Sequence, residues 1–446
     1  MKNCGFTIRE IVNFTLPLIF TSLIINLMFI TDRIVLARYS IDSMNAVALG
    51  GNFLAIVTFA GINVAQIATV FVGQYNGMKE FLKVGYPVWQ MIYFALAISV
   101  FFVPLSFFCN KFGLFPPAYE SEGISYLVPL LRCAGLGAMI AAFNSFFIGR
   151  GKSSTVIVVT VMANILNAIF DVILVFGVKG IIPEMGARGA AYTTIATQCF
   201  SIIVMACIFL NEKHREKYNT WDWKFRPKLF WNCIKIGLPI SISKIFSLLG
   251  WFLLLLLYNY ASEDLATLES FALTVWMTFI FVADGCAKAL SSMSANLIGR
   301  NDKDAVINLF NFFCKGQVIL SIILAFPMIF FSEYFLKLAD YINGDFACLH
   351  GEMLFLLKST WLILLTDGFL YLICGVLNAG GDTKFPMIME ISIFWVGVVL
   401  PTTILYYTGN LNSMRGVYTL IPLTQALNTA IIYYRYKKQN WFNKLI

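Results

Sequence analysis

Apolar residues along this chain gather in long stretches that short polar segments separate. Twelve stretches are long enough to cross a membrane, since about 20 apolar residues in a helix span roughly 30 Å of hydrocarbon. They lie near residues 11–36, 46–75, 88–108, 124–148, 154–177, 187–210, 233–260, 267–299, 309–332, 352–379, 385–408 and 413–434. The pattern predicts an all-α integral membrane protein with twelve transmembrane helices and both termini on one side.

The two halves of this predicted bundle resemble each other in sequence. "FTLPLIFTSL" recurs as "IGLPISISKI", which places Pro17 opposite Pro239. "FVGQYNGMKEF" recurs as "MSANLIGRNDK", which places Gly77 opposite Gly299, and "GRGKSSTVIVV" recurs as "NAGGDTKFPMI" in the same order. Because each half has six spans, the repeats keep one orientation, and a pseudo-two-fold axis along the membrane normal relates them.

The longest polar segment, "NEKHREKYNTWDWKFRPKLFWN", separates the sixth predicted span from the seventh. We therefore expect an N-lobe of six spans at residues 1–210, a cytoplasmic linker at 211–232 and a C-lobe of six spans at 233–446. Parallel repeats of this kind place a central cavity between two pseudo-symmetric lobes.

The composition agrees with a membrane bundle. Hydrophobic residues make up 59% of the chain and charged residues 13%, whereas soluble proteins carry about 25% charged residues. Of the 32 lysines and arginines, 19 lie in the N-terminus, the even-numbered loops and the C-terminus. The positive-inside rule then places both termini in the cytoplasm. This asymmetry accounts for the net charge of +8, so the charge does not require a nucleic-acid partner.

Several acidic residues fall inside the predicted spans. They are Asp32, Asp171, Asp284, Asp367 and, closer to a span end, Glu390. On insertion scales, the free-energy cost of placing one ionised Asp at the centre of a membrane helix is about +2.5 to +3.5 kcal/mol. Each of these acids must therefore be paired, protonated, bound to a cation or exposed to water.

Asn167 and Asp171 stand four residues apart in the stretch "NILNAIFDVILVFG". This spacing puts both side chains on one helix face. Their oxygens suit a hard cation such as Na⁺, whereas a second carboxylate nearby would let one acid hold a proton at neutral pH. The pattern leaves Na⁺ and H⁺ open, and a structural hydrogen bond across helices is the alternative to both.

The order of motifs along the chain resembles the multidrug and toxic compound extrusion (MATE) family of transporters. The matching segments in the first half are "LPLIF", "ITDRIVLARYS", "ALGGN", "VFVGQYNG", "GRGKSST", "NILNAIFDVILVFG" and "IPEMGARGAAYTTIATQ". Those in the second half are "GLPISIS" and "GVLNAGGDTKFP". The resemblance covers nearly the whole chain. It implies two six-helix lobes in a V shape, with substrate moving between them by alternating access.

The resemblance also implies an ion-coupling site in the first lobe. The family places a carboxylate in span one, an Asn and an Asp one turn apart in span five, and a Thr in span six. These positions match Asp32, Asn167, Asp171 and Thr194. Pro17 lies in the same span as Asp32, and a helix proline permits a kink. We expect either a hinge at Pro17 that responds to the ion or a static bend there.

The second lobe departs from the family pattern. One branch of the family places a Glu in span seven and an Asp in span ten; Asp367 matches the Asp, but Ser247 stands where the Glu is expected. Asp367 is then a substrate contact or a structural hydrogen-bond acceptor. Lys244, Lys288 and Asp284 also lie at span depth. Asp284 and Lys288 have the spacing of an ion pair on one helix face; otherwise these residues line the cavity and suit anionic or zwitterionic cargo.

These features predict a secondary active antiporter in the inner (cytoplasmic) membrane of a bacterium. It would export amphipathic, cationic drugs or toxic metabolites in exchange for Na⁺ or H⁺, acting as a monomer in the lipid bilayer. The ten cysteines show no metal spacing, and the two histidines fall in loops away from any catalytic grouping. We therefore expect no enzyme, no cofactor and no nucleic-acid partner. A lipid-linked saccharide flippase of the same superfamily is the alternative.

Overall fold

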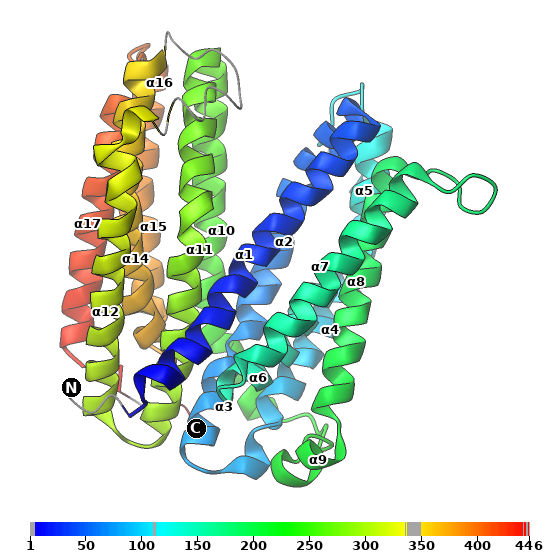
Figure 1. The fold of residues 1–446 in the computed structure, drawn as a ribbon, viewed down its shortest axis with the longest axis vertical. Helices are drawn as coiled ribbons and strands as arrows, with labels where there is room; N and C mark the ends of the chain where they lie inside the picture. Colours follow the sequence, from blue (N-terminus) through cyan, green and yellow to red (C-terminus); the bar gives the residue numbers. More distant parts are fainter. Residues whose placement is uncertain are drawn as a thin grey trace. The chain divides into compact units, whose positions relative to one another are not determined.

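The computed structural model describes residues 5–109, 113–334, 336, 349–439, 441–442 and 445. Over these residues the chain is almost entirely helical, with one isolated antiparallel bridge between Val178 and Ile182 in place of any strand (Figure 1). The prediction of an all-α protein is confirmed.

The helices of the first half follow the predicted spans closely. They are α1 (Ile8–Tyr39), α2 (Ile41–Gln66), α3 (Ala68–Gly77), α4 (Tyr86–Ser106), α5 (Glu120–Arg132), α6 (Gly135–Gly149), α7 (Ser153–Phe176) and α8 (Gly186–Phe209), with the short η1 (Phe81–Lys83) before α4. The linker contains a further short helix, α9 (Glu212–Tyr218). The helices α5 and α6 occupy the fourth predicted span and meet at a bend of 44°.

The second half repeats this plan, and its first two helices are the longest of the described chain. The helices are α10 (Pro227–Ala261), α11 (Glu263–Gly299), α12 (Lys303–Ala325), α14 (His350–Ala379), α15 (Lys384–Phe394), α16 (Leu400–Tyr407) and α17 (Arg415–Lys437). The π-helical turns η3 (Phe326–Phe330) and η5 (Trp395–Val399) extend α12 and join α15 to α16.

Ten helices of the described chain are long and apolar enough to cross a membrane, or eleven if the bent pair α5–α6 counts as one span. The helix at the twelfth predicted position, α17, does not pass this test. Polar side chains such as Gln425 and Asn428 interrupt its apolar stretch. The chain is thus a multi-pass membrane protein.

The chain divides into two compact units. The N-unit comprises residues 7–241 and 295–301, and the C-unit comprises residues 242–294 and the described residues from 302 to 442. In the N-unit, α7 packs between α1 and α8, and α2 packs on α5 and α6 (Figure 1). In the C-unit, α14 packs on α12 and α17.

The repeated glycines Gly77 and Gly299 lie where α3 crosses the last turn of α11 within the N-unit. A Cβ atom on Gly77 would lie 2.0 Å from the carbonyl oxygen of Asn296, and one on Gly299 would lie 2.3 Å from that of Gln74. Gly77 thus faces Asn296, three residues before Gly299, and Gly299 faces Gln74, three residues before Gly77. The absence of a side chain at both positions lets the two backbones touch.

Candidate functional site

The predicted coupling residues Asp32, Asn167 and Asp171 come together inside the N-unit. The helix α7 presents Asn167 and Asp171 on the face that packs against its neighbours, and both are only 1% exposed. The carboxyl group of Asp32, on α1, lies beside that of Asp171. The i, i+4 spacing predicted the common face of α7, and helix packing supplies the partner from α1.

The polar atoms of this cluster have no hydrogen-bond partner among the described residues. The buried orphans are Oδ1 of Asp32, both amide atoms of Asn167 and both carboxylate oxygens of Asp171. Buried polar atoms are almost always hydrogen-bonded, and each orphan costs about 1–3 kcal/mol. Five such atoms therefore lie on three neighbouring residues, and four of them are oxygens, the atoms that coordinate hard cations.

The surroundings of the acids are largely apolar. Leu36 and Val175 lie one helical turn beyond Asp32 and Asp171, and they belong to one core cluster with Val47, Tyr126 and Ala190. Among the ion pairs of the described residues, none involves Asp32 or Asp171. Two facing carboxylates in such a place repel each other strongly. A cation or a proton between them relieves that repulsion, and the oxygen-rich donor set fits Na⁺ as well as H⁺.

The threonine closest to this pair is Thr193, on α8. Thr193 is completely buried beside the carboxyl group of Asp171, and its hydroxyl donates to the carbonyl of Gly189 at 3.1 Å. Thr194 is half-buried and donates to the carbonyl of Ala190 at 3.1 Å. Neighbouring helix residues point about 100° apart, so the hydroxyls of Thr193 and Thr194 face different directions, and only that of Thr193 faces Asp171.

Pro17 lies inside α1, which runs without a break from Ile8 to Tyr39. The hydroxyl of Thr21 donates to the carbonyl of Pro17 at 2.7 Å, one turn further along. A hinge at Pro17 stays a prediction.

A second polar cluster occupies the interior of the C-unit. Asp367, on α14, is buried and accepts a hydrogen bond of 2.9 Å from the indole of Trp276, on α11. Lys244, on α10, places its ammonium group 4.7 Å from the centre of the Tyr371 ring. Tyr371 follows Asp367 by one helical turn, so the lysine and the buried acid line the same region.

Glu390 joins this cluster from α15. The hydroxyl of Ser243 donates to one of its carboxylate oxygens, and Cys374 lies 3.5 Å from the other. Asp284 and Lys288 form an ion pair of 2.6 Å on the surface of α11, and both are partly exposed. The C-unit thus contains three acids against two lysines in this cluster.

A protein-family model, MatE, matches residues 17–173 and 239–403, one segment in each half of the chain. The two segments together cover well over half of the 446 residues. The chain belongs to the MatE family, the MATE efflux transporters.

Individual members of the MATE family align with this chain at low identity. The "Probable multidrug resistance protein NorM" of Thermotoga maritima is 24% identical over 67% of this chain and 65% of its own length. The "Uncharacterized transporter YisQ" of Bacillus subtilis is 22% identical over 93% of this chain and 90% of its own. The solved structure of a multidrug resistance MATE family transporter in an outward-facing conformation matches 96% of this chain and 95% of its own with a TM-score of 0.83 at 18% identity. The MATE fold of two six-helix lobes is therefore shown.

Two polar residues of this MATE protein escaped the sequence analysis. Glu269, on α11, is buried and accepts a hydrogen bond of 2.9 Å from the hydroxyl of Tyr418. It lies just inside the predicted span 267–299, so a scan for every acid within the spans would have found it. Thr193 gave no such signal, because only the rotation of α8 distinguishes it from Thr194.

Replacing Thr193 by Val is expected to weaken ion binding more than replacing Thr194 by Val. Each change swaps a hydroxyl for a methyl of similar size, but only Thr193 lies beside Asp171. A lost hydrogen bond to a charged group costs about 1.5–3 kcal/mol, or roughly ten-fold or more in affinity. The apparent ion affinity of transport by the two variants measures the difference. An equal loss of ion affinity in both variants would contradict a role for Thr193 in ion binding.

Proposed function

We propose that this MATE transporter is a secondary active antiporter that exports amphipathic, cationic solutes in exchange for Na⁺ or H⁺. The coupling ion binds between Asp32, Asn167 and Asp171, with Thr193 or Thr194 as a neutral ligand. The observation that supports this proposal is the group of five orphaned polar atoms inside an apolar lobe.

The ion drives export because it and the cargo favour opposite-facing states. An ion between Asp32 and Asp171 removes their repulsion and lets α1 pack closely on α7, so the ion stabilises one arrangement of these helices. Cargo that binds the other arrangement is released when the ion enters. One charge crossing 100 mV supplies about 2.3 kcal/mol, and a chemical gradient adds to this.

The cluster in the C-unit is proposed to contact the cargo. Asp367 and Glu390 offer negative charge to an organic cation, while Lys244 lies near enough to bind a carboxylate on the same molecule. Lys288 and Asp284 are paired and partly exposed on the flank of this cluster. A lipid-linked saccharide flippase would require a more cationic interior than three acids and two lysines provide, and the family match does not favour it.

We further propose that the protein works as a monomer in the cytoplasmic membrane of a bacterium, with both termini and the linker in the cytoplasm. The excess of lysine and arginine in the even-numbered loops supports this orientation. Labelling of single cysteines introduced at Lys213 and at Lys179 with a membrane-impermeant reagent tests it. In intact cells the residue-179 cysteine is expected to react and the residue-213 cysteine to stay protected.

Uptake of a fluorescent organic cation into inside-out vesicles tests the antiport itself. Vesicles that contain the protein receive either a Na⁺ gradient at constant pH or a pH gradient without Na⁺. We expect one of these gradients, applied alone, to drive accumulation against the concentration gradient of the dye. Equal accumulation with and without both gradients would contradict antiport.

A further inference from the structure

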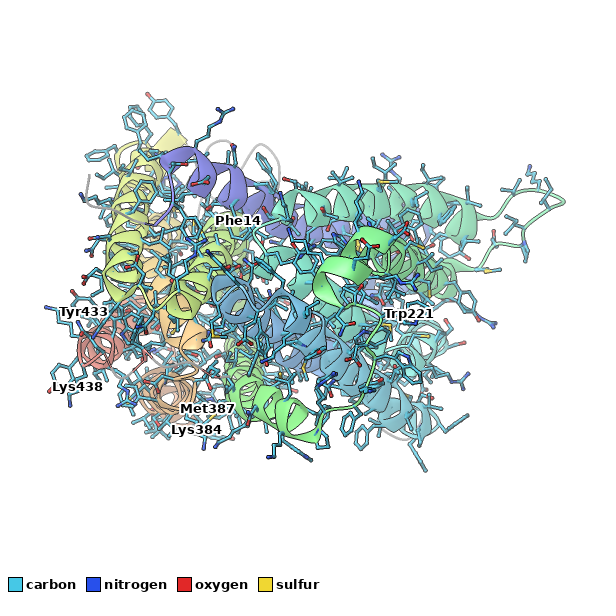
Figure 2. The ribbon with its side chains drawn as sticks, turned by 90° about the horizontal axis from the view of Figure 1, so that it is seen from below. Phe14, Trp221, Lys384, Met387, Tyr433 and Lys438 are labelled. Carbon is cyan, nitrogen blue, oxygen red and sulfur yellow. The ribbon has the colours of Figure 1, made fainter. Side chains whose placement is uncertain are left out.

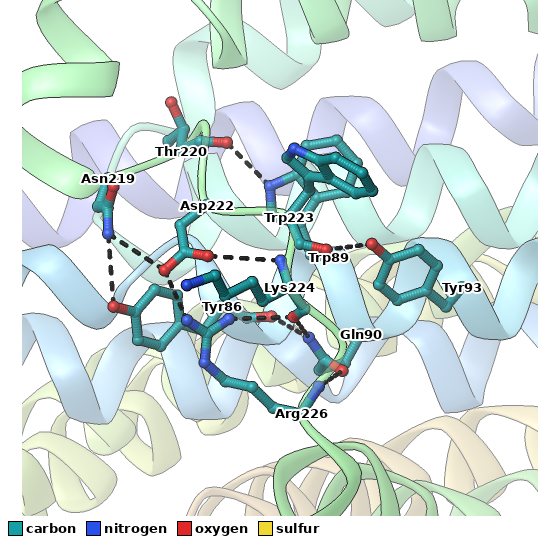
Figure 3. A network of polar contacts seen from close by, with 10 residues as sticks. All are labelled: Tyr86, Trp89, Gln90, Tyr93, Asn219, Thr220, Asp222, Trp223, Lys224 and Arg226. Carbon is teal, nitrogen blue, oxygen red and sulfur yellow. Dashed lines mark hydrogen bonds and ion pairs between the residues drawn. The ribbon is translucent and has the colours of Figure 1, made fainter.

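The linker between α9 and α10 is not a loose loop. Residues 219–226, called the strap here, begin with a turn at 219–222 and continue beside α4 (Figure 3). The side chain of Gln90, which is fully buried, donates to the carbonyl of Lys224 at 3.1 Å and accepts from the amide of Arg226 at 2.9 Å. This amide group satisfies the strap backbone much as a neighbouring strand would.

The strap is fastened to the first turns of α4. The indole of Trp89 donates to the carbonyl of Thr220 at 2.8 Å, and the hydroxyl of Tyr93 donates to the carbonyl of Trp223 (Figure 3). Trp89 and Tyr93 are one helical turn apart, about 6 Å along the axis. Both lie near one end of the candidate span Phe81–Ser106, so we expect the strap to lie at the membrane interface.

The anchored backbone turns large aromatic side chains outward. Trp221, Trp223 and Phe225 are 55%, 64% and 53% exposed. Trp231, in the first turns of α10, is 64% exposed. Figure 2 labels Trp221 in a view from below the orientation of Figure 1. Exposed tryptophans are costly in water but are enriched where protein meets lipid headgroups.

Basic side chains are exposed on α9, the strap and the start of α10, and the guanidinium group of Arg215 lies 4.6 Å from the centre of the Trp221 ring. The exposed ones are Lys213, Arg215, Lys217, Lys224 and Lys228. Within the strap, the one acid, Asp222, is already paired with Arg226 at 2.6 Å. Arg226 in turn stacks 3.5 Å from the ring of Tyr86. With Glu212 and Glu216 of α9 also exposed, five exposed basic residues stand against two exposed acids, and the surface is positive and aromatic.

We propose that the strap and its flanking lysines bind acidic phospholipids of the cytoplasmic leaflet. The tryptophan rings lie at the boundary between headgroups and acyl chains, and Lys224 and Lys228 contact the lipid phosphates. A lipid fits this surface better than a soluble protein does, because the strap lies beside the apolar part of α4. The leaflet follows from the orientation in the proposed function; the binding itself does not depend on transport.

Native mass spectrometry of the full chain in detergent tests the proposal, with phosphatidylglycerol and phosphatidylcholine of identical acyl chains as probes. The wild type is expected to retain phosphatidylglycerol at lower lipid concentration. Lys224→Gln with Lys228→Gln is expected to weaken that binding by roughly ten-fold or more, since each basic residue near an anionic surface contributes about five-fold. Phosphatidylcholine binding stays unchanged.

Lys179→Gln with Lys358→Gln serves as the matched control, because it removes two exposed charges far from the strap in sequence. It is expected to leave the lipid preference unchanged, and glycerol phosphate in solution is expected not to displace the lipid. In the wild type, brominated phosphatidylglycerol should quench tryptophan fluorescence more than it does in Trp221→Phe with Trp223→Phe.

An equal response to the two lipids in the wild type would overturn the proposal, as would an equal loss in the control. Displacement by glycerol phosphate would show a soluble-phosphate site instead. These outcomes are independent of ion binding at Asp171, so a failure here leaves the antiport proposal standing.

Discussion

Asp171→Asn is expected to abolish gradient-driven export while leaving the protein folded in the membrane. The substitution keeps the size of the side chain and removes the charge that faces Asp32. Loss of one partner from a buried charged pair costs about 2–5 kcal/mol, so ion affinity should fall by at least roughly 30-fold. Proteoliposomes with an imposed ion gradient measure the loss as the initial rate of dye transport.

Asp42→Asn is the matched control for this experiment. Asp42 lies in the same unit, in the first turn of α2, and is exposed. We expect transport by this variant to match the wild type. Asp32→Asn should behave like Asp171→Asn, because it removes the other of the two carboxylates between which the ion binds. Export that persists at the wild-type rate in both variants would exclude the coupling role.

Gly77→Ala is expected to destabilise the N-unit. The effect should be larger than that of a methyl group added at an exposed helix position. The new Cβ would lie 2.0 Å from the carbonyl oxygen of Asn296. This oxygen belongs to the backbone, so no change of side-chain rotamer can relieve the clash. Forced overpacking costs about 1–3 kcal/mol and more when a backbone must move. The crossing of α3 and α11 must open, so the thermal midpoint in detergent should fall sharply.

Gly299→Ala should produce a similar fall, because its Cβ would meet the carbonyl of Gln74 at 2.3 Å. Gly316→Ala on α12 is the control, since its Cβ would meet open space. Alanine is favoured over glycine in a helix by about 1 kcal/mol, so this variant should be as stable as the wild type or more so. A fall of equal size in all three would mean that the crossing is not specially tight.

Hydropathy predicted the helices well because membrane spans must be both long and apolar. It did not predict the 44° bend between α5 and α6, since a window of apolar residues reads the same whether or not the helix is straight. It also treated the linker as a polar connection. The strap depends on Gln90, a polar residue in an otherwise apolar helix. The role of its amide follows only from its hydrogen bonds to the linker backbone.

The candidate site was predictable to the extent that it depends on spacing along one helix. Asn167 and Asp171 share a face of α7 by their separation alone, whereas their nearness to Asp32 depends on how α1 packs. The resemblance to the MATE family supplied that pairing in advance. The choice between Thr193 and Thr194 depends on a rotation of α8 by one residue, which neither composition nor hydropathy encodes.

Direct measurement of ion binding to the purified protein is the sharpest test of the central claim that the three polar residues of the first lobe hold the coupling ion. Wild type and Asp171→Asn, in detergent, would be titrated with radioactive Na⁺ at high pH, and proton uptake would be recorded on acidification without Na⁺. The account predicts that the wild type binds at least one of these ions and that Asp171→Asn loses that binding. Equal binding by the two proteins, or none of either ion by the wild type, would contradict it.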